Sequence, residues 1–310
     1  MPCRYLFKLI ALMCLVTLLC PACREEDGVV ELQAPSGDVT LYVRAAGGPD
    51  PEAALIAIGG GPGYSSHYLT DLDRLAGPEM AVVTYDQRGM GRSSNPSPYA
   101  TNYDLMDYVQ DLDAVRKAVR MKKVHLLGHY WGAMVALKYA SLYPENVGSI
   151  VIYGAAPPTV EWAVHFSIQM EERLKKLIET GVIDLEDLTR DSPEWFREVL
   201  RAYFSSPDFW FSAIERGEPP EGNDNVNRLT FQAMGAFDLR EDFAKVSHPV
   251  LILFGEDDPG GRPLAQATVD ALSNADVELI IMEKCGHFWQ EQPEEFYRRV
   301  AAFLNPILSP

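Results

Sequence analysis

Three glycine-containing segments of this sequence combine residue types that do nucleophilic and acid–base chemistry. Residues 128–132 read GHYWG, residues 255–259 read GEDDP and residues 285–289 read CGHFW. Each segment follows an apolar run typical of a buried strand, and sites in open α/β sheets lie at the carboxyl ends of such strands. An aspartate of the second segment can orient His287, and an imidazole oriented in this way acts as a general base. The order of turn, acid and base along the chain therefore predicts one catalytic site.

The first of these segments has the spacing of a strained turn that exposes its middle residue. Glycines at positions 128 and 132 permit a sharp strand–turn–helix, which lifts residue 130 above the sheet edge. The N–H of Trp131 then lies at a helix N-terminus, where negative charge is stabilised. The pattern is that of G-x-S-x-G, with Tyr130 in place of serine. A phenol carries its oxygen farther from the backbone than serine does, and its ring fills the space of an acyl group. We expect His129 to point toward the sheet.

Two further loops follow predicted strands and favour a supporting role. Residues 59–63, GGGPG, come directly after the apolar run 54–58, and glycines there let the backbone turn tightly and aim N–H groups at an anion. No Gly-Lys-Ser/Thr follows, so this is not a phosphate loop. Residues 86–93, DQRGMGRS, follow the run 80–85 and place charged side chains between glycines. We interpret this loop as structural ion pairs behind the site.

The segments that position these loops alternate between strand and helix. Seven short runs are rich in apolar and β-branched residues, and the later ones are apolar on both faces, as in a covered parallel sheet. They are residues 39–45, 54–58, 80–85, 123–127, 149–153, 249–254 and 277–282. Helical periodicity separates them at residues 105–119, 133–143 and 293–304. This alternation predicts an α/β fold with a mostly parallel sheet covered by helices.

The alternation breaks between residues 157 and 237. This stretch has helical patterns at residues 166–180 and 193–203, a polar loop at residues 218–225, no clear strand and many aromatic side chains. An inserted helical subdomain that caps the sheet explains the break. We expect four tryptophans to surround a pocket for an apolar group: Trp162, Trp195 and Trp210 of the insert and Trp289 of the last loop.

These motifs, in this order and spacing, resemble the α/β-hydrolase fold superfamily, and most closely its proline iminopeptidase branch, peptidase family S33. GGGPG stands for the branch's HGGPG, DQRGMGRS nearly repeats its DQRG-x-GRS, and GHYWG stands for its G-x-S-W-G. The resemblance covers roughly residues 39–306. It implies an α/β-hydrolase core over residues 24–156 and 238–310, and a helical cap over residues 157–237.

The resemblance also implies a role for single residues. It gives the nucleophile position to Tyr130, the acid to Asp258, the base to His287 and the oxyanion-hole amides to Gly61 and Trp131. The sequence departs from the branch at Gly59, where a histidine is usual, and the cap lacks the E-L-x-W-F-Y-like segment of proline iminopeptidases. The resemblance therefore implies a serine hydrolase or aminopeptidase architecture without carrying proline specificity.

The first residues have the pattern of an export signal. A basic start precedes the apolar run 9–19, which is too short to cross a hydrocarbon layer that takes about 20 residues in helix. A small residue before Cys23 resembles the end of a bacterial lipoprotein signal. We predict a signal peptide over residues 1–23, lipidation at Cys23 and a place in the bacterial cell envelope; a soluble periplasmic or secreted protein is the alternative.

Charge and composition restrict the partners. The 310 residues carry a net charge of −17, which repels phosphate backbones and anionic bilayers. We predict no nucleic-acid binding, and membrane contact only through Cys23. The histidines and cysteines lack metal-ligand spacing and no cofactor motif is present, so we predict neither metal nor cofactor. Cys285 is expected to be a small buried hydrophobic residue. The expected partner is a small molecule or short peptide.

Three functions fit this constellation. The first is hydrolysis of an ester, amide or peptide bond beside an apolar group, with His287 activating water directly or with Tyr130 as a variant of the nucleophile. The second is a lyase or cyclase in which the Asp258–His287 dyad is the base and Tyr130 donates a proton. The third is a pseudoenzyme, an exported protein that binds a small apolar ligand without turning it over. The place of the Tyr130 ring relative to His287 discriminates among them.

Overall fold

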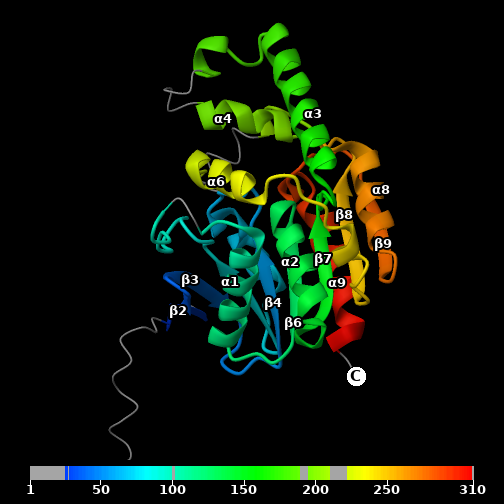
Figure 1. Cartoon of the computed structure of the whole chain (residues 1–310). Coiled ribbons are helices and arrows are strands. Elements are labelled where there is room, and N and C mark those ends of the chain that lie inside the picture. Colours follow the sequence, from blue (N-terminus) through cyan, green and yellow to red (C-terminus); the bar gives the residue numbers. More distant parts are fainter. Residues whose placement is uncertain (1–24, 27, 100–101, 189–194, 210–221, 309–310) are drawn as a thin grey trace, which may run out of the picture.

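A nine-stranded sheet forms the framework of the molecule. The computed structural model describes residues 25–26, 28–99, 102–188, 195–209 and 222–308 (Figure 1). The strand order is β1-β2-β3-β5-β4-β6-β7-β8-β9. The three pairs β1–β2, β2–β3 and β3–β5 are antiparallel. All the remaining pairs of neighbouring strands, from β5–β4 to β8–β9, are parallel. The strands are β1 (Glu25–Glu26), β2 (Val29–Ser36), β3 (Val39–Ala46), β4 (Ala53–Ile58), β5 (Met80–Tyr85), β6 (Val124–His129), β7 (Val147–Tyr153), β8 (Pro249–Gly255) and β9 (Asp276–Met282).

The predicted α/β fold with a mostly parallel sheet is confirmed, and all seven predicted strands are present. The prediction lacks β1 and β2, which extend the sheet at its antiparallel edge. The middle strands are apolar throughout because both of their faces are covered. In β4, Ala54, Ile56 and Ile58 pack in one buried cluster, whereas Leu55 and Ala57 pack in a second. Successive side chains of a strand point to opposite faces, so each cluster fills one side of the sheet.

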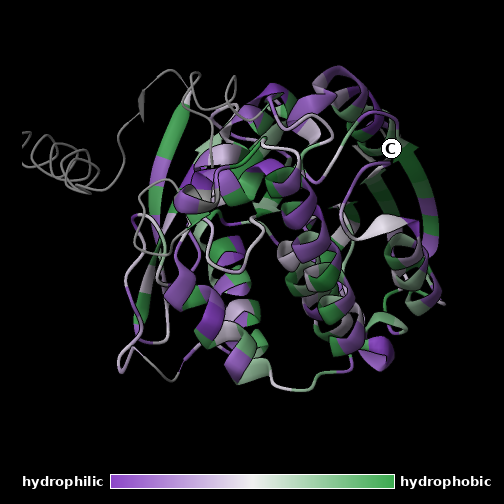
Figure 2. Cartoon of the chain, turned by 90° about the horizontal axis from the view of Figure 1, so that it is seen from above, coloured by the Kyte–Doolittle hydropathy of each residue, from purple (hydrophilic) through white to green (hydrophobic). Residues whose placement is uncertain are grey.

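Helices cover both faces of the sheet. The first cluster includes residues of α1 (Leu105–Ala118), α2 (Trp131–Leu142), α7 (Arg240–Phe243) and α8 (Gly261–Ala271), and the second includes residues of η1 (Ser66–Leu75) and α9 (Pro293–Leu308). Short 3₁₀ turns lie at η2 (Pro144–Asn146) and η5 (Trp289–Glu291). Seen from above, the helices carry both hydrophobic and hydrophilic residues, as helices with one buried face do (Figure 2). Within the described ranges, the structure contains no helix with the length and apolar character of a membrane span.

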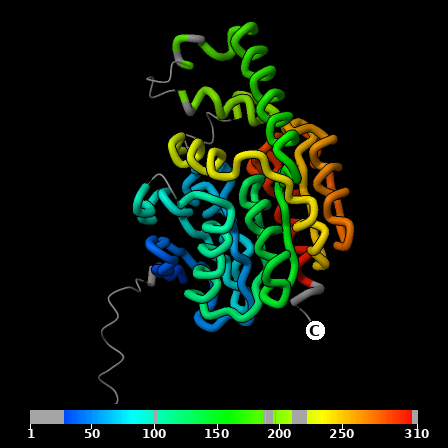
Figure 3. The backbone as a smooth tube through the Cα atoms, viewed as in Figure 1, coloured from blue at the N-terminus to red at the C-terminus, as the bar shows by residue number. Residues whose placement is uncertain are grey.

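The elements described between residues 157 and 237 are helical. They are α3 (Val160–Glu179), η3 (Leu185–Leu188), α4 (Trp195–Leu200), η4 (Arg201–Tyr203) and α6 (Asp224–Met234). In Figure 3, α3 and α4 stand above one end of the sheet, and α9 runs down toward the other. The polar loop predicted at residues 218–225 is wrong at its last two residues, because Asn223 caps α6, which begins at Asp224; residues 218–221 lie outside the described part.

Candidate active site

The turn between β6 and α2, which we call the elbow (residues 128–132), has the strained geometry that its glycines predict. Tyr130 adopts φ 46° and ψ −98°, outside the regions that residues with a side chain usually occupy. A Cβ on Gly128 would lie 2.5 Å from the backbone of Ala133, and one on Gly132 would overlap the carbonyl oxygen of Ile58. Only glycine fits at both positions, so the sharp strand–turn–helix follows directly from the sequence.

The predicted acid and base lie in direct contact. Asp258 follows β8 and His287 follows β9, and Nδ1 of His287 is 2.7 Å from Oδ2 of Asp258. Both residues are buried. The other carboxylate oxygen accepts the N–H of Gly260 at 2.7 Å, which fixes the orientation of the carboxylate. Because Nδ1 is engaged, Nε2 on the opposite side of the ring is the nitrogen left for a reacting proton.

The ring of Tyr130 packs against this base. Its centroid lies 5.2 Å from that of His287 in an edge-on arrangement, and 4.6 Å from that of Phe166 in α3. The Tyr130 hydroxyl forms no hydrogen bond with any described residue, and the residue is 7% exposed. Burial raises the pKa of Tyr130 well above its usual value, and Tyr203 and Asp258 raise it further. A neutral phenol without a hydrogen bond to the base is a poor nucleophile.

Two aromatic residues of the cap complete the surroundings of the base. The rings of Phe166 and Tyr203 both lie 5.2 Å from that of His287. The hydroxyl of Tyr203 is hydrogen-bonded to Tyr64, which comes just after the GGGPG loop. The sequence predicted an aromatic cap, but the choice of these two residues depends on how the cap folds back onto the sheet, which periodicity does not encode.

Of the four tryptophans predicted to surround a pocket, Trp289 is instead a core residue. It is fully buried, stacks on Phe296 at 4.8 Å and donates Nε1–H to Asp71 at 3.0 Å. The prediction is wrong because Trp289 starts a 3₁₀ turn that faces the second core cluster. Trp162 forms an edge-on contact with His165 of its own helix, and Trp195 begins α4. Trp210 lies outside the described residues.

His129 links three parts of the site in one hydrogen-bond chain. Its Nε2 lies 2.9 Å from the carbonyl oxygen of His287, and its Nδ1 lies 2.8 Å from the Tyr68 hydroxyl. That hydroxyl accepts the N–H of Gly60 at 2.7 Å. Burial, with the nearby His287, lowers the pKa of His129 well below its usual value. A neutral His129 that donates from Nε2 and accepts at Nδ1 satisfies every member of the chain. The sequence placed His129 toward the sheet without predicting this role.

The amides assigned to the oxyanion hole belong to loops that Gln87 holds together. Gln87 donates to the Gly59 carbonyl at 2.8 Å and accepts the indole N–H of Trp131 at 2.9 Å. Among the described residues, the backbone N–H groups of Gly61 and Trp131 take part in no side-chain or turn hydrogen bond. They are therefore available to a developing negative charge, whereas the amide of Gly60 is already bonded to Tyr68.

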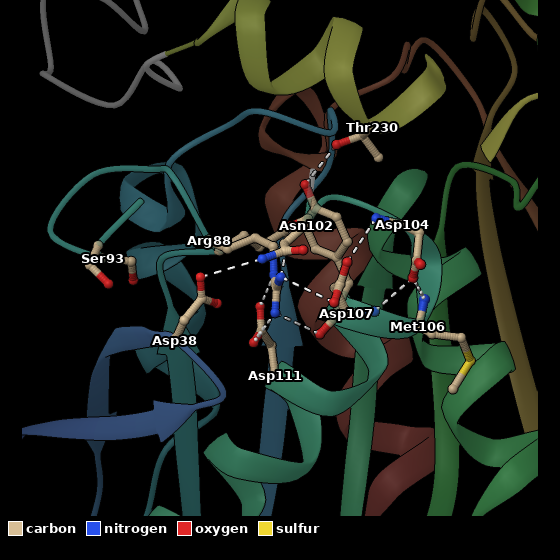
Figure 4. Close-up of polar contacts among 12 residues, drawn as sticks. Asp38, Arg88, Ser93, Asn102, Asp104, Met106, Asp107, Asp111 and Thr230 are labelled. Carbon is tan, nitrogen blue, oxygen red and sulfur yellow. Dashed lines mark hydrogen bonds and ion pairs between the residues drawn. The ribbon is translucent and has the colours of Figure 1, made fainter. Parts of the chain in front are cut away.

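The charged residues of the DQRG loop form the scaffold predicted for them. Arg88 makes two 2.8 Å contacts with the fully buried carboxylate of Asp111 in α1, and also donates to the carbonyl of Asn102 at 2.8 Å (Figure 4). Asp86 accepts the amide and the hydroxyl of Ser66, each at 2.8 Å. These contacts fix the loop behind the site and place no charge of Arg88 next to His287.

Cys285 is fully buried beside the base loop, as expected. Its sulfur lies 3.0 Å from the Tyr153 hydroxyl, which also donates to the Gly286 carbonyl at 3.0 Å. Burial raises the pKa of the Cys285 thiol to about 12. A thiol that stays protonated is not a nucleophile, so Cys285 does not replace the missing serine.

A strained elbow, an aspartate–histidine pair and two uncommitted amides at the carboxyl ends of parallel strands define a class of protein. A family model described as alpha/beta hydrolase fold matches residues 53–293, and the chain belongs to this family. The fold and family predicted from the motifs are thereby confirmed.

The relatives of this chain include proline iminopeptidases. The proline iminopeptidase of Lactobacillus crispatus (strain ST1) is 26% identical over 304 residues, which cover 89% of this chain and 98% of the relative. Among solved structures, a proline iminopeptidase-related protein from Thermus thermophilus has 25% identity and a TM-score of 0.69, covering 92% of this chain and 99% of its own. The proline iminopeptidase of Mycobacterium smegmatis has 22% identity and a TM-score of 0.67, covering 90% and 98%.

Proposed function

We propose that this protein hydrolyses ester, amide or peptide bonds by using the Asp258–His287 pair to activate water, without an acyl-enzyme on Tyr130. The observation that carries the proposal is the buried 2.7 Å contact between His287 Nδ1 and Asp258 Oδ2. An imidazole held by a carboxylate is a general base in the required tautomer. Membership of the α/β-hydrolase family supports the reaction class.

The proposed reaction needs no group beyond these residues and a water molecule. Nε2 of His287 takes a proton from water while the water oxygen bonds to the carbonyl carbon, and the carbonyl π electrons move to its oxygen. The amides of Gly61 and Trp131 stabilise that oxyanion. On collapse, the bond to the leaving group breaks, and the imidazolium returns its proton to the departing alkoxide or amine. The products are a carboxylic acid and an alcohol or amine.

The surroundings of the base favour a substrate with an apolar group. Tyr130, Phe166 and Tyr203 present aromatic rings around His287, and burial keeps the two phenols neutral by raising their pKa. Such rings bind apolar groups through dispersion and area burial. The relatives named proline iminopeptidase make prolyl amides one substrate to include among others.

The alternative that a specific observation favours is a binding protein without turnover. The Tyr130 ring is buried between Phe166 and His287, where an acyl group would enter a serine hydrolase. A ligand could then be held by the cap and the rings without reaching Nε2. A lyase or cyclase has weaker support, because the family model that matches this chain describes a hydrolase fold.

Export and lipidation at Cys23 are part of the proposal. They are supported by the sequence pattern alone, because residues 1–24 lie outside the described part of the chain. A place in the cell envelope would present the site to extracellular esters, amides or short peptides. Mass spectrometry of the protein from bacterial membranes would test the proposal, with a diacylglyceryl-modified cysteine at position 23 as the expected result.

The proposed hydrolysis is tested by removing the base. We expect the wild-type protein to release p-nitrophenol from apolar p-nitrophenyl esters slowly, and His287→Ala to lower kcat/KM by about 10²- to 10⁴-fold, as loss of general acid–base catalysis does. Prolyl and other aminoacyl p-nitroanilides complete the panel. The measurement is initial rate against substrate concentration, above the rate with buffer alone.

A matched control is available on the same strand as the elbow. His125 is a buried histidine near the start of β6, at the end of the strand away from the elbow. Its Nδ1 lies 2.8 Å from the hydroxyl of Ser149 in β7. His125→Gln should leave the rate within about twofold, since it contacts neither the dyad nor the elbow. If the wild type is inert on the whole panel, or if His287→Ala is as active as the wild type, the hydrolase proposal is wrong and the binding protein is favoured.

A further inference from the structure

One short stretch of the cap, residues 203–206, is bonded to both loops of the acid–base pair. The Tyr203 carbonyl accepts the N–H of His287 itself at 2.7 Å. The Ser205 hydroxyl donates to the carboxylate of Asp257 at 2.6 Å, one residue before the acid. The stretch therefore touches the base loop on one side and the acid loop on the other. Neither contact was predictable from the motifs.

Glu291 of η5 reinforces the same junction with a single carboxylate. One of its oxygens accepts the N–H of Gly286 at 2.6 Å and the N–H of Ser205 at 3.0 Å, and the other accepts the N–H of Ser206 at 3.0 Å. Gly286 immediately precedes the base. Hydrogen bonds from amides to an ionised carboxylate are about twice as strong as neutral ones. Glu291 thus joins the backbone of the base loop to the backbone of the cap.

The environment of Glu291 shows that these amides are its principal partners. Its pKa is raised by burial, while the three amide hydrogen bonds act in the opposite direction and Asp257 adds repulsion. Arg173 of α3 does not pair with the carboxylate; it donates to the carbonyls of Asp257 (2.5 Å) and Phe204 (3.2 Å). Glu291 is half-buried, and a carboxylate that accepts hydrogen bonds from two separate backbone segments holds those segments in fixed relation.

We infer that Glu291 is a positioning residue that orients His287 by joining its loop to cap residues 203–206, so that the acid–base pair is held in place only while the cap is seated. The inference deepens the proposed function and rests on it, because the position of the base matters for turnover only if His287 reacts. Movement of the cap away from the sheet would break the bond from the His287 amide together with those to Glu291. The seating of residues 203–206 and the alignment of the base are therefore coupled.

The test compares Glu291→Gln with a matched exposed acid. The amide side chain of glutamine keeps the size of Glu291 but removes its charge and one acceptor. Glu294→Gln is the control, since Glu294 lies three residues away and pairs with Arg74 at the surface. Backbone amide hydrogen exchange is measured at residues 203–206 and 284–288 in the wild type and both variants. We expect Glu291→Gln to accelerate exchange at both segments, His287 included, by about tenfold or more, and Glu294→Gln to leave both unchanged.

Kinetics then separate positioning from mere support of the fold. Glu291→Gln is introduced into the wild type and into Tyr130→Ser, and kinetics are measured in whichever of the two turns over faster. In that protein, Glu291→Gln should lower kcat by about tenfold with little change in KM, because ground-state binding is retained. Faster exchange confined to residues 284–288, with residues 203–206 unchanged, would overturn the coupling. An unchanged kcat in a variant with faster exchange at both segments would overturn the positioning role. If neither background turns over any substrate, the proposed hydrolysis fails by itself, and the exchange at His287 alone decides whether Glu291 couples the cap to the base.

Discussion

The two halves of the candidate site differ in how completely they match a working hydrolase. In the base half, Asp258 and His287 are buried, 2.7 Å apart and braced by neighbouring backbone groups. In the elbow half, the backbone has the strained turn and the uncommitted Trp131 amide that a nucleophile site needs. The ring of Tyr130, however, occupies the space between Phe166 and His287. The backbone geometry of the elbow and the chemistry of its side chain are therefore separable properties.

The separation has a physical cause in the packing of the turn. Gly128 and Gly132 are fixed by close approach to Ala133 and Ile58, and Gln87 ties Trp131 to the glycine loop. None of these contacts involves the side chain of residue 130. The fold consequently keeps the elbow whatever side chain it carries, and the side chain alone determines whether a covalent route exists.

The largest effect on the contrast between the halves is expected from replacing the phenol of the elbow with the short hydroxyl of serine. Tyr130→Ser should raise ester hydrolysis by about 10³-fold or more over the parent, because it adds a nucleophile next to an oriented base and opens the space beside Phe166. The measurement is kcat/KM on the same p-nitrophenyl esters, with labelling by a fluorophosphonate as a second readout.

Tyr130→Ala is the control for this gain, since it opens the same space without supplying a hydroxyl. We expect it to remain below the serine variant by at least about 10²-fold and to resist labelling. Equal activity of the two variants would mean that access to water, not a nucleophile, limits the site. A labelled wild type would instead revive Tyr130 as a direct nucleophile.

A smaller effect should follow from distorting the turn itself. A Cβ at Gly132 overlaps the Ile58 carbonyl oxygen, so Gly132→Ala should lower the free energy of unfolding by about 3 kcal/mol. Gly77→Ala is the matched control, because a Cβ there meets no atom within 4 Å. Urea unfolding followed by tryptophan fluorescence measures both. Equal stability of the two variants would show that the elbow relaxes freely and that its glycines are not required by packing.

The parts of the structure that could be predicted are those encoded within a few neighbouring residues. The strands β4 to β8 carry apolar side chains on both faces, and the elbow carries its own glycines. Strand β2 was missed because it lies near the antiparallel edge, where alternating polar residues and Pro35 weaken the pattern. Helix α6 was missed because its cap, Asn223, follows a polar stretch typical of a loop.

The rest of the site depends on contacts between residues far apart in the chain. Motif order brought Asp258 and His287 together, since both follow strands of one sheet. Nothing local marks Tyr203 or Glu291 as neighbours of the base, because the cap must first fold back over the sheet. Trp289 shows the opposite kind of error. Its place in a site motif predicted a pocket residue, but its side chain packs in the core, where it stacks on Phe296.

The smallest expected effect probes the chain that joins the two halves, through His129. His129→Leu leaves the Tyr68 hydroxyl and the His287 carbonyl without their buried partner, which should lower the free energy of unfolding by about 2 kcal/mol near neutral pH.

Burial lowers the pKa of His129 in the folded protein, so below about pH 6.5 the unfolded chain binds a proton that the folded chain does not. Wild-type stability from this residue therefore falls as the pH falls, by up to about 1.4 kcal/mol per pH unit. The leucine variant lacks this loss, so plots of the free energy of unfolding against pH for the wild type and the variant should converge toward acid pH. The contribution of His125 is the same in both proteins and cancels in their difference. Curves that stay parallel would mean that His129 is protonated in the folded protein, and its Nδ1 would then donate to the Tyr68 hydroxyl instead of accepting from it.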